Sequence, residues 1–169
     1  AIALVGSSVH AGGRSASLTA PNGLAMSMSI ESALSQAAVE PDELGCTQAQ
    51  GLGSALADPI EISALNSVMS MAAAGSRLAI GCHKPNVGHS EAASGMLGIA
   101  TAQQMLLKSS VAASAQLRTV NPLVVQSMTQ SSLALPLNNL AELDAARCGV
   151  TAFGWSGTFS HVLLELSGT

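Results

Sequence analysis

The sequence predicts an α/β domain in which a mixed sheet lies between layers of helices. Apolar stretches with strand-like and helix-like spacing alternate along the chain in the order β-α-β-α-β-α, and an irregular segment and two closing strands follow. A chain of 169 residues with 48% hydrophobic content can bury one core, and it fits one domain better than two. We therefore expect a single unit over residues 1–169, with a five-stranded mixed sheet and helices on both faces.

Five segments have the composition of strands. The first is an apolar run at residues 2–9, which ends in a glycine-containing loop. Short apolar stretches follow at residues 45–49 and 78–82, each between two helical patterns. The last two strands, at residues 148–153 and 161–166, flank a glycine-rich turn. These segments are the strands that we expect in the sheet.

Three segments have helical spacing. Apolar side chains recur at near-helical intervals in residues 22–38. The motif DPIE at residues 58–61 predicts a helix that begins with an acidic N-cap, a proline and a glutamate three residues after the cap, and that stops near Gly75. Residues 90–107 are rich in Ala and Gly and contain several polar side chains. They predict a helix buried on most sides rather than a membrane span.

Two parts of the chain have a less regular pattern. Pro122 and Pro136 interrupt residues 109–140, so we expect loops with short extended pieces there. The first five residues are strand-like and contain no initiator methionine, as if the chain were cut inside a strand. We interpret the chain as a fragment or a processed piece.

The composition excludes several classes of partner. Only 9% of the residues are charged, the formal net charge is −4, and the six Lys and Arg residues are scattered, so nucleic acid is not an expected partner. Cys46, Cys82 and Cys148 are odd in number and lack metal-ligand spacing, which favours a reducing compartment, the cytoplasm or a plastid, over a disulfide framework or a zinc site. No transmembrane segment is expected.

Four groups of short motifs follow one another along the chain. They are GSSVHAGGRS at residues 6–15 with LTAPNG at 18–23, QAQGLGS at 48–54 with DPIE at 58–61, KPNVGH at 84–89 with EAA at 91–93, and FGWSGTFSH at 153–161. In the same order, they resemble the motifs GSAVNQDGRS and LTAPNG, EAHGTGT and DPIE, KTNIGHxEAA, and FGFGGTNAH of β-ketoacyl synthases of the polyketide-synthase type. The chain is thus similar to the C-terminal half of such a ketosynthase.

This resemblance implies a thiolase-like half-domain with the order βαβαβαββ. A complete ketosynthase carries an acyl group on a cysteine, decarboxylates a malonyl thioester and joins the two by Claisen condensation. The acyl chains arrive on the phosphopantetheine arm of an acyl carrier protein, so we expect no directly bound cofactor. The nucleophilic cysteine belongs to a DTACSS-type motif of the N-terminal half, and this chain has no such motif. Expected partners are that half or a similar half-domain, and the carrier protein; an oligomer is also expected.

His89 and Lys84 are the candidate catalytic residues that the resemblance implies. At the start of a predicted helix, the His89 ring would stay neutral and donate a hydrogen bond to a developing oxyanion; the alternative is a histidine that merely caps the helix. Lys84 would set the electrostatics around His89, and Glu91 could pair with it. The alternative for Lys84 is a solvated ion pair. His10, His83 and His161 are interpreted as structural.

Gln50 departs from the family pattern in the position of a catalytic histidine. An imidazole exchanges a proton near neutral pH, whereas a carboxamide only donates and accepts hydrogen bonds. General acid or base chemistry at this position is therefore expected to be lost. Leu52 and Gln48 replace a threonine and a glutamate of the same motif, which indicates relaxed catalytic constraint.

Four further residues are predicted to contact the substrate because of their places in the motifs: Asn86, Trp155, Gly157 and Thr158. Trp155 stands where the family has an aromatic gate over the acyl tunnel, and Ser156 replaces a glycine beside it. The alternative for Trp155 is an ordinary core aromatic.

Two functions remain open from the sequence. The first is a fragment or degenerate form of a polyketide or fatty-acid β-ketoacyl synthase, impaired in condensation and inactive as this chain alone. The second is a non-catalytic structural or scaffold protein derived from a ketosynthase half-domain. An upstream segment with an intact nucleophile motif would favour the first.

Overall fold

The computed structural model describes residues 1–17, 20–115, 117–129, 131–137, 141–142 and 146–168. Leu18 and Thr19, the first two residues of the motif LTAPNG, thus lie outside the described residues. The described part of the chain forms a six-stranded mixed sheet in the order β1-β8-β7-β2-β3-β5, and a two-stranded pair of β4 and β6. The strands are β1 (Ile2–Ala11), β2 (Cys46–Gln48), β3 (Leu78–Gly81), β4 (Ser110–Val111), β5 (Leu133–Ala134), β6 (Ala141–Glu142), β7 (Arg147–Phe153) and β8 (Thr158–Leu166).

The five predicted strands are five neighbours in this sheet, and the predicted fold class is confirmed. Strands β7, β2, β3 and β5 run parallel, and β8 and β1 are antiparallel to their neighbours. The sixth strand, β5, has only two residues and lies at the sheet edge beside β3. It belongs to the segment that was expected to contain short extended pieces.

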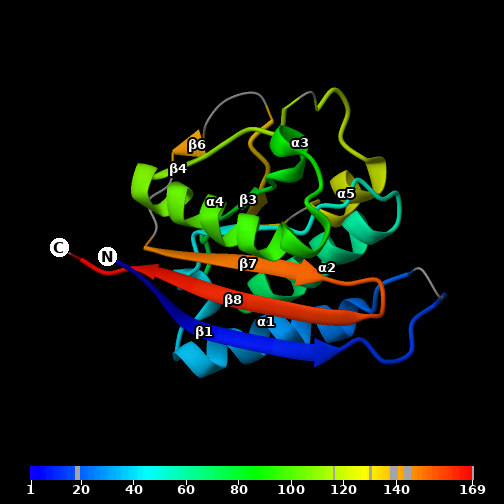
Figure 1. The fold of residues 1–169 in the computed structure, drawn as a ribbon, viewed down its shortest axis with the longest axis horizontal. Helices are drawn as coiled ribbons and strands as arrows, with labels where there is room; N and C mark the ends of the chain where they lie inside the picture. The colour runs from blue at the N-terminus through cyan, green and yellow to red at the C-terminus, as the bar shows by residue number, and fades with distance from the viewer. Residues whose placement is uncertain (18–19, 116, 130, 138–140, 143–145, 169) are drawn as a thin grey trace.

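Helices cover both faces of the sheet (Figure 1). Helix α1 packs on β1 and β8, α2 packs beside α1, and α5 packs on α2, whereas α4 lies across β7 on the opposite face. The helices are α1 (Gly23–Ala37), α2 (Ala57–Met69), α3 (Lys84–Val87), α4 (Ser94–Lys108) and α5 (Pro122–Ser127), with 3-10 turns η1 (Pro41–Glu43) and η2 (Glu91–Ala93).

The start of α2 differs from the prediction. Asp58 is not the N-cap: Leu56 holds that position, and the Ser54 hydroxyl accepts the Ala57 amide instead. The carboxylates of Asp58 and Glu61 accept hydrogen bonds from the preceding loop. The helix also ends at Met69 and not near Gly75. Tertiary contacts have therefore replaced the local cap.

The other helices bring three further corrections. Helix α4 begins at Ser94, after the η2 turn, and is buried only on the side that faces the sheet; Met96 and Leu107 on its outer side are 71% and 60% exposed. Helix α5 was not predicted, because Pro122 was interpreted as a break, whereas it is the first residue of a helix capped by Asn121. The short α3 was not predicted either.

Small residues allow the helices to approach the sheet closely. A Cβ at Gly98 of α4 would lie 2.9 Å from Val150 of β7, and a Cβ at Gly6 of β1 would overlap the carbonyl oxygen of Ala33 in α1. On the α1 side the core includes Ile30, Leu65 and Leu163, all buried. With only two Phe and one Trp in the chain, close backbone approach replaces aromatic packing.

The state of the cysteines and the apolar length of the helices bear on disulfide bonding and on membrane insertion. Cys46 and Cys148 are free, fully buried thiols that face each other in the register of β2 and β7, and Cys82 is a free, half-buried thiol. Among the residues that the structure describes, no helix combines the length and the apolar character needed to cross a bilayer.

We expect the substitution Gly6→Ala to lower the free energy of unfolding by about 1–3 kcal/mol, because the added methyl group meets a backbone carbonyl that cannot move independently. Urea denaturation measures the change. The matched control is Gly95→Ala in α4, where the new Cβ makes an ordinary 3.6 Å contact with Ala152. Equal stabilities of the two variants would contradict the packing described for β1 and α1.

Candidate active site

The predicted catalytic residues and the predicted gate residue Trp155 follow the carboxyl ends of three adjacent parallel strands. Gln50 follows β2, Lys84 and His89 follow β3, and Trp155 follows β7. In α/β sheets, ligands bind preferentially at this end of the strands, because the loops there project functional groups from a rigid frame. Residues from three separate sequence motifs therefore lie on loops at the same edge of the sheet, which we take as the candidate site.

Lys84 and Gln50 are in direct contact. The Nζ atom of Lys84 donates to the backbone oxygen of Gln50 at 2.5 Å and to its Oε1 at 3.1 Å, and both side chains are buried. Burial lowers the pKa of Lys84, and the neighbouring acidic groups Glu61 and Asp58 oppose this effect. The expected pairing of Lys84 with Glu91 is wrong, because Glu91 lies exposed in the η2 turn and Lys84 turns toward Gln50.

The loop after β2 is held by the two carboxylates at the start of α2. Glu61 accepts the amides of Gln50 at 2.7 Å and of Gly51 at 3.0 Å, and Asp58 accepts the amide of Leu52 at 3.0 Å. Gly51 has a φ of 48°, and a Cβ there would lie 2.5 Å from Cys82 Sγ, so only glycine fits this turn. The sequence identified these acids as helix-start residues, and the only signal for their second role was the match of DPIE to the family motif.

Glu61 combines complete burial with a shifted ionisation. Desolvation raises the pKa of its carboxyl to about 7, and the hydrogen bonds from the Gly51 and Gln50 amides act against the rise. Burial likewise raises the pKa of Asp58. The loop that positions Gln50 therefore depends on a carboxyl group that changes its charge near neutral pH.

His89 lies between α3 and η2, five residues before α4 begins, so it is not at the start of that helix as expected. Its Nδ1 accepts the Glu91 amide at 3.1 Å and lies 2.9 Å from the Ser94 hydroxyl. An amide can only donate, so the proton of a neutral ring belongs on Nε2. The ring is exposed, and Nε2–H is free of these contacts. Local hydrogen bonds, and not a helix dipole, make His89 a hydrogen-bond donor; nothing in the sequence indicated the role of Ser94.

Of the four predicted substrate-contact residues, Asn86 lies in α3, and the other three lie in the β7–β8 hairpin. Asn86 binds the loop after β4, because its Nδ2 donates to the Ala113 oxygen and its Oδ1 accepts the Ala115 amide. Trp155 is 94% exposed at the tip of the β7–β8 hairpin, so the alternative of a core aromatic is wrong. In the same hairpin, Gly157 has a φ of 79° and Thr158 begins β8. Substrate contact by these four residues stays a prediction.

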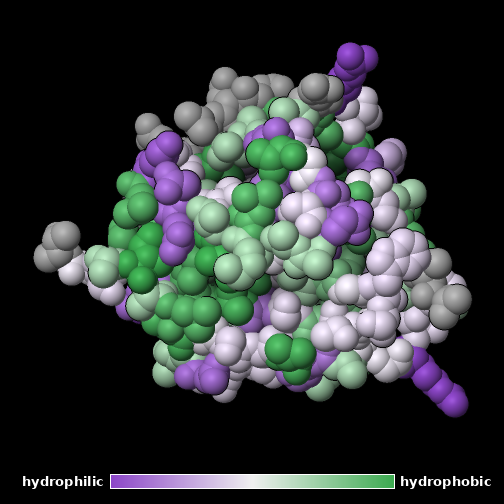
Figure 2. Space-filling view, viewed as in Figure 1, coloured by the Kyte–Doolittle hydropathy of each residue, from purple (hydrophilic) through white to green (hydrophobic). Residues whose placement is uncertain are grey.

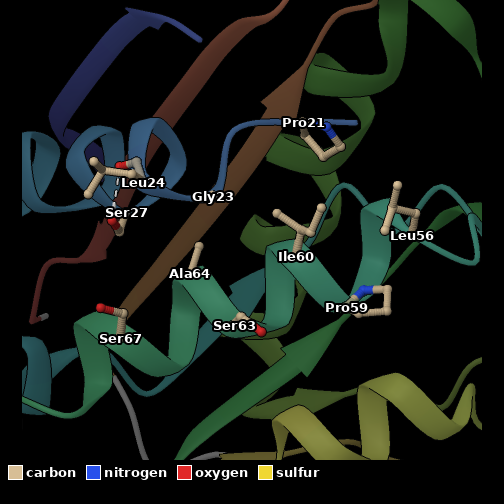
Figure 3. A pocket seen from close by; sticks show the side chains of 10 residues that line it. All are labelled: Pro21, Gly23, Leu24, Ser27, Leu56, Pro59, Ile60, Ser63, Ala64 and Ser67. Carbon is tan, nitrogen blue, oxygen red and sulfur yellow. Dashed lines mark hydrogen bonds between the residues drawn. The ribbon is translucent and has the colours of Figure 1, made fainter. Parts of the chain in front are cut away.

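A cavity of about 450 Å³ lies between α1 and α2 (Figure 3). Its walls include Leu24 and Ser27 of α1, and Leu56, Ile60 and Ser63 at the start of α2 and just before it. No lining residue is ionisable, so the cavity supplies no acid or base.

The fold agrees with the comparisons to known proteins. Residues 2–118 match the family model for the C-terminal domain of β-ketoacyl synthases. The chain is 37% identical over 165 residues to the polyketide synthase ThaG of Burkholderia thailandensis, and 35% identical over 165 residues to a component of the phenolphthiocerol/phthiocerol polyketide synthase of Mycobacterium tuberculosis. The chain belongs to the family of β-ketoacyl synthase C-terminal domains.

These relatives are much longer than the chain. The matches cover 94% and 95% of this chain but 3% and 9% of the two synthases. Among solved structures, the oxazolomycin ketosynthase domain OzmH KS7 of Streptomyces albus superposes with a TM-score of 0.88 at 29% identity, and the match covers 98% of this chain and 29% of that one. A ketosynthase of the Bacillus subtilis bacillaene synthase shares the fold, with a TM-score of 0.86 at 24% identity.

The buried side chains of Glu61 and His161 should give the stability of the fold opposite dependences on pH. Glu61 titrates near 7 in the folded state against an ordinary pKa of 4.5, so its contribution to stability is lost as pH rises from about 4.5 to 7. Burial lowers the pKa of His161 from 6.5 to about 4, so stability is lost as pH falls from about 6.5 to 4. Each group contributes a slope of at most about 1.4 kcal/mol per pH unit.

The variant Glu61→Gln should therefore gain stability with rising pH between about 4.5 and 6.5, whereas the parent profile should be flatter. Urea denaturation at several pH values in this window measures both slopes. Glu31→Gln, on the exposed side of α1, is the control. Parallel profiles of the parent and Glu61→Gln would show that Glu61 ionises in the folded protein as it does in the unfolded chain.

Proposed function

We propose that this chain is the C-terminal part of a ketosynthase that holds or transfers an acyl chain but is impaired in condensation. The observation that carries the proposal is the environment of Gln50. Its carboxamide takes the place of a catalytic histidine of the family, and Lys84 and the backbone oxygen of Phe153 bind its two ends. A buried amide with both ends occupied supplies no proton-transfer group at this position.

His89 supplies the hydrogen-bond donor that acyl transfer needs. Its Nε2–H donor is exposed at the strand ends, where a thioester carbonyl would gain negative charge during acyl transfer. One donor of this kind supports attack by an external nucleophile on a thioester. Decarboxylative condensation also needs the second imidazole, which Gln50 replaces.

The nucleophile and the acyl chains must come from partners. No cysteine of the chain lies in a nucleophile motif, and Cys46 and Cys148 are fully buried. We infer that an N-terminal ketosynthase half or a similar half-domain supplies the reactive thiol. An acyl carrier protein would deliver the substrate on its phosphopantetheine arm, since polyketide synthases are among the relatives.

The outer side of α4 is the surface that we assign to the partner half-domain. Figure 2, viewed from this side, shows hydrophobic and near-neutral surface over α4 and the adjoining strands, interrupted by hydrophilic side chains. Exposed Met96 and Leu107 of α4 and Leu4 and Val9 of β1 contribute large apolar side chains. Exposed apolar surface of this kind marks an interaction site.

In an assay with a compatible nucleophile-bearing half, the chain should support acylation without forming a β-ketoacyl product; the chain alone should form neither. Loss of one positioned acid/base group costs about a hundred- to ten-thousand-fold in rate. Acyl and malonyl carrier-protein thioesters are supplied, and mass spectrometry follows both species. Gln50→His should restore some product, whereas Gln126→His, at an exposed position of α5 away from the α4 surface, should restore none.

Turnover of the parent at a rate normal for ketosynthases would refute the impairment. Absence of acylation with a competent partner half would favour the scaffold alternative. The variant His89→Ala distinguishes the acyl-transfer role from the scaffold role. An acyl-transfer role predicts that this variant loses acylation while its binding to the partner half is unchanged.

Taken alone, the chain should associate through the α4 side. We expect oligomers in sedimentation velocity and binding of a hydrophobic dye, and the double substitution Met96→Lys/Leu107→Lys should weaken both. Met71→Lys, an exposed position just beyond α2, is the matched control. A stable monomer that binds no dye would contradict the assignment of this surface.

A further inference from the structure

The side chain of Gln50 continues the contact between β2 and β7 beyond the point where backbone pairing stops. The last paired residues are Gln48 of β2 and Val150 of β7. Two residues further along, the Gln50 Nε2 donates to the backbone oxygen of Phe153 at 3.1 Å, at the end of β7. The other end of the same carboxamide accepts from Lys84 Nζ at 3.1 Å, after β3. One side chain thus joins the ends of three strands.

Only a group with a donor and an acceptor at opposite ends can make both contacts. Gln50 is 5% exposed, so water does not replace a contact that is lost, and an unpaired polar end would be destabilising. A glutamate would keep the contact with Lys84 but would place a second acceptor against the Phe153 oxygen. A methionine of similar length would make neither contact.

The Phe153 oxygen lies at the base of the turn that carries Trp155. On the β8 and β1 side, backbone hydrogen bonds hold this turn: the Gly154 amide donates to the Thr158 oxygen, and the Gly12 amide donates to the Gly157 oxygen. On the β2 side, the hydrogen bond that the described residues provide is the one from Gln50. The indole of Trp155 is 94% exposed and adds no packing of its own.

We propose that Gln50 is a positioning residue that connects the ammonium group of Lys84 to the Trp155 turn, and that its carboxamide is not available to a thioester. The claim goes beyond the proposed function, because it concerns how Trp155 is held whether or not the protein transfers acyl groups. In this role glutamine is a structural substitute for the histidine of the family, and the motion of Trp155 depends on it.

The sequence supplies a fluorescent probe for this proposal, since Trp155 is the only tryptophan and the chain has no tyrosine. Time-resolved anisotropy of the parent, Gln50→Met and Gln50→Glu chains is recorded at pH 8, where an introduced glutamate beside Lys84 is ionised. We expect the amplitude of fast local motion to rise at least about twofold in both variants, and hydrogen exchange at Gly154 to become about tenfold faster. Gln126→Met and Gln126→Glu, at an exposed position of α5, should match the parent.

Unchanged anisotropy and exchange in a Gln50 variant whose circular dichroism is that of the parent would overturn the proposal. A measurement on the parent covers the case in which neither variant folds. In the parent chain, the side-chain amide of Gln50 should show a hydrogen-bond coupling to the Phe153 carbonyl carbon by NMR and should exchange more slowly than that of the exposed Gln126. Fast exchange without coupling would overturn the proposal, and neither result depends on catalytic activity.

Discussion

An ammonium group that is removed from water needs acceptors close to it, and Lys84 imposes this requirement on the whole site. Its acceptors are two oxygens of Gln50, which can reach it because Glu61 holds the amides of the loop after β2. Glu61 in turn projects from α2, a helix on one face of the sheet, whereas Lys84 begins the segment that leads to α4 on the other. The compensation of one buried charge therefore fixes how the loops at the strand ends are arranged.

Close packing by small residues is the second constraint. Gly98 allows α4 to lie on Val150 of β7, and Gly6 allows β1 to lie on α1. This packing buries one side of α4 and leaves Met96 and Leu107 on the other. The same helix thus completes the core and presents an apolar surface, which is consistent with a chain that spans 29% of the solved oxazolomycin ketosynthase domain KS7.

Sequence patterns located the elements better than they located the roles of individual side chains. Five strands and the three long helices were predictable because apolar runs, helical spacing and a helix-start motif mark them in the sequence, whereas β4, β5 and β6 are only two residues long. The motif DPIE was also visible, but its acids bind the loop of residues 50–52 and not the end of their own helix. Helix-capping preferences predicted that these carboxylates would bind the first amides of their own helix. They bind instead the amides of the loop that follows β2, which have no partner within that loop.

The sequence by itself determined the fold class and the family, because these depend on periodicity and motif order. Only the tertiary structure decided which groups meet. In the structure, Lys84 binds Gln50 and not Glu91. The Glu91 amide donates to His89 Nδ1, which leaves the proton of a neutral ring on Nε2, and Trp155 lies outside the core. Hydrogen bonds and burial depend on distances between residues far apart in the chain, and those distances exist only once the strand ends are side by side.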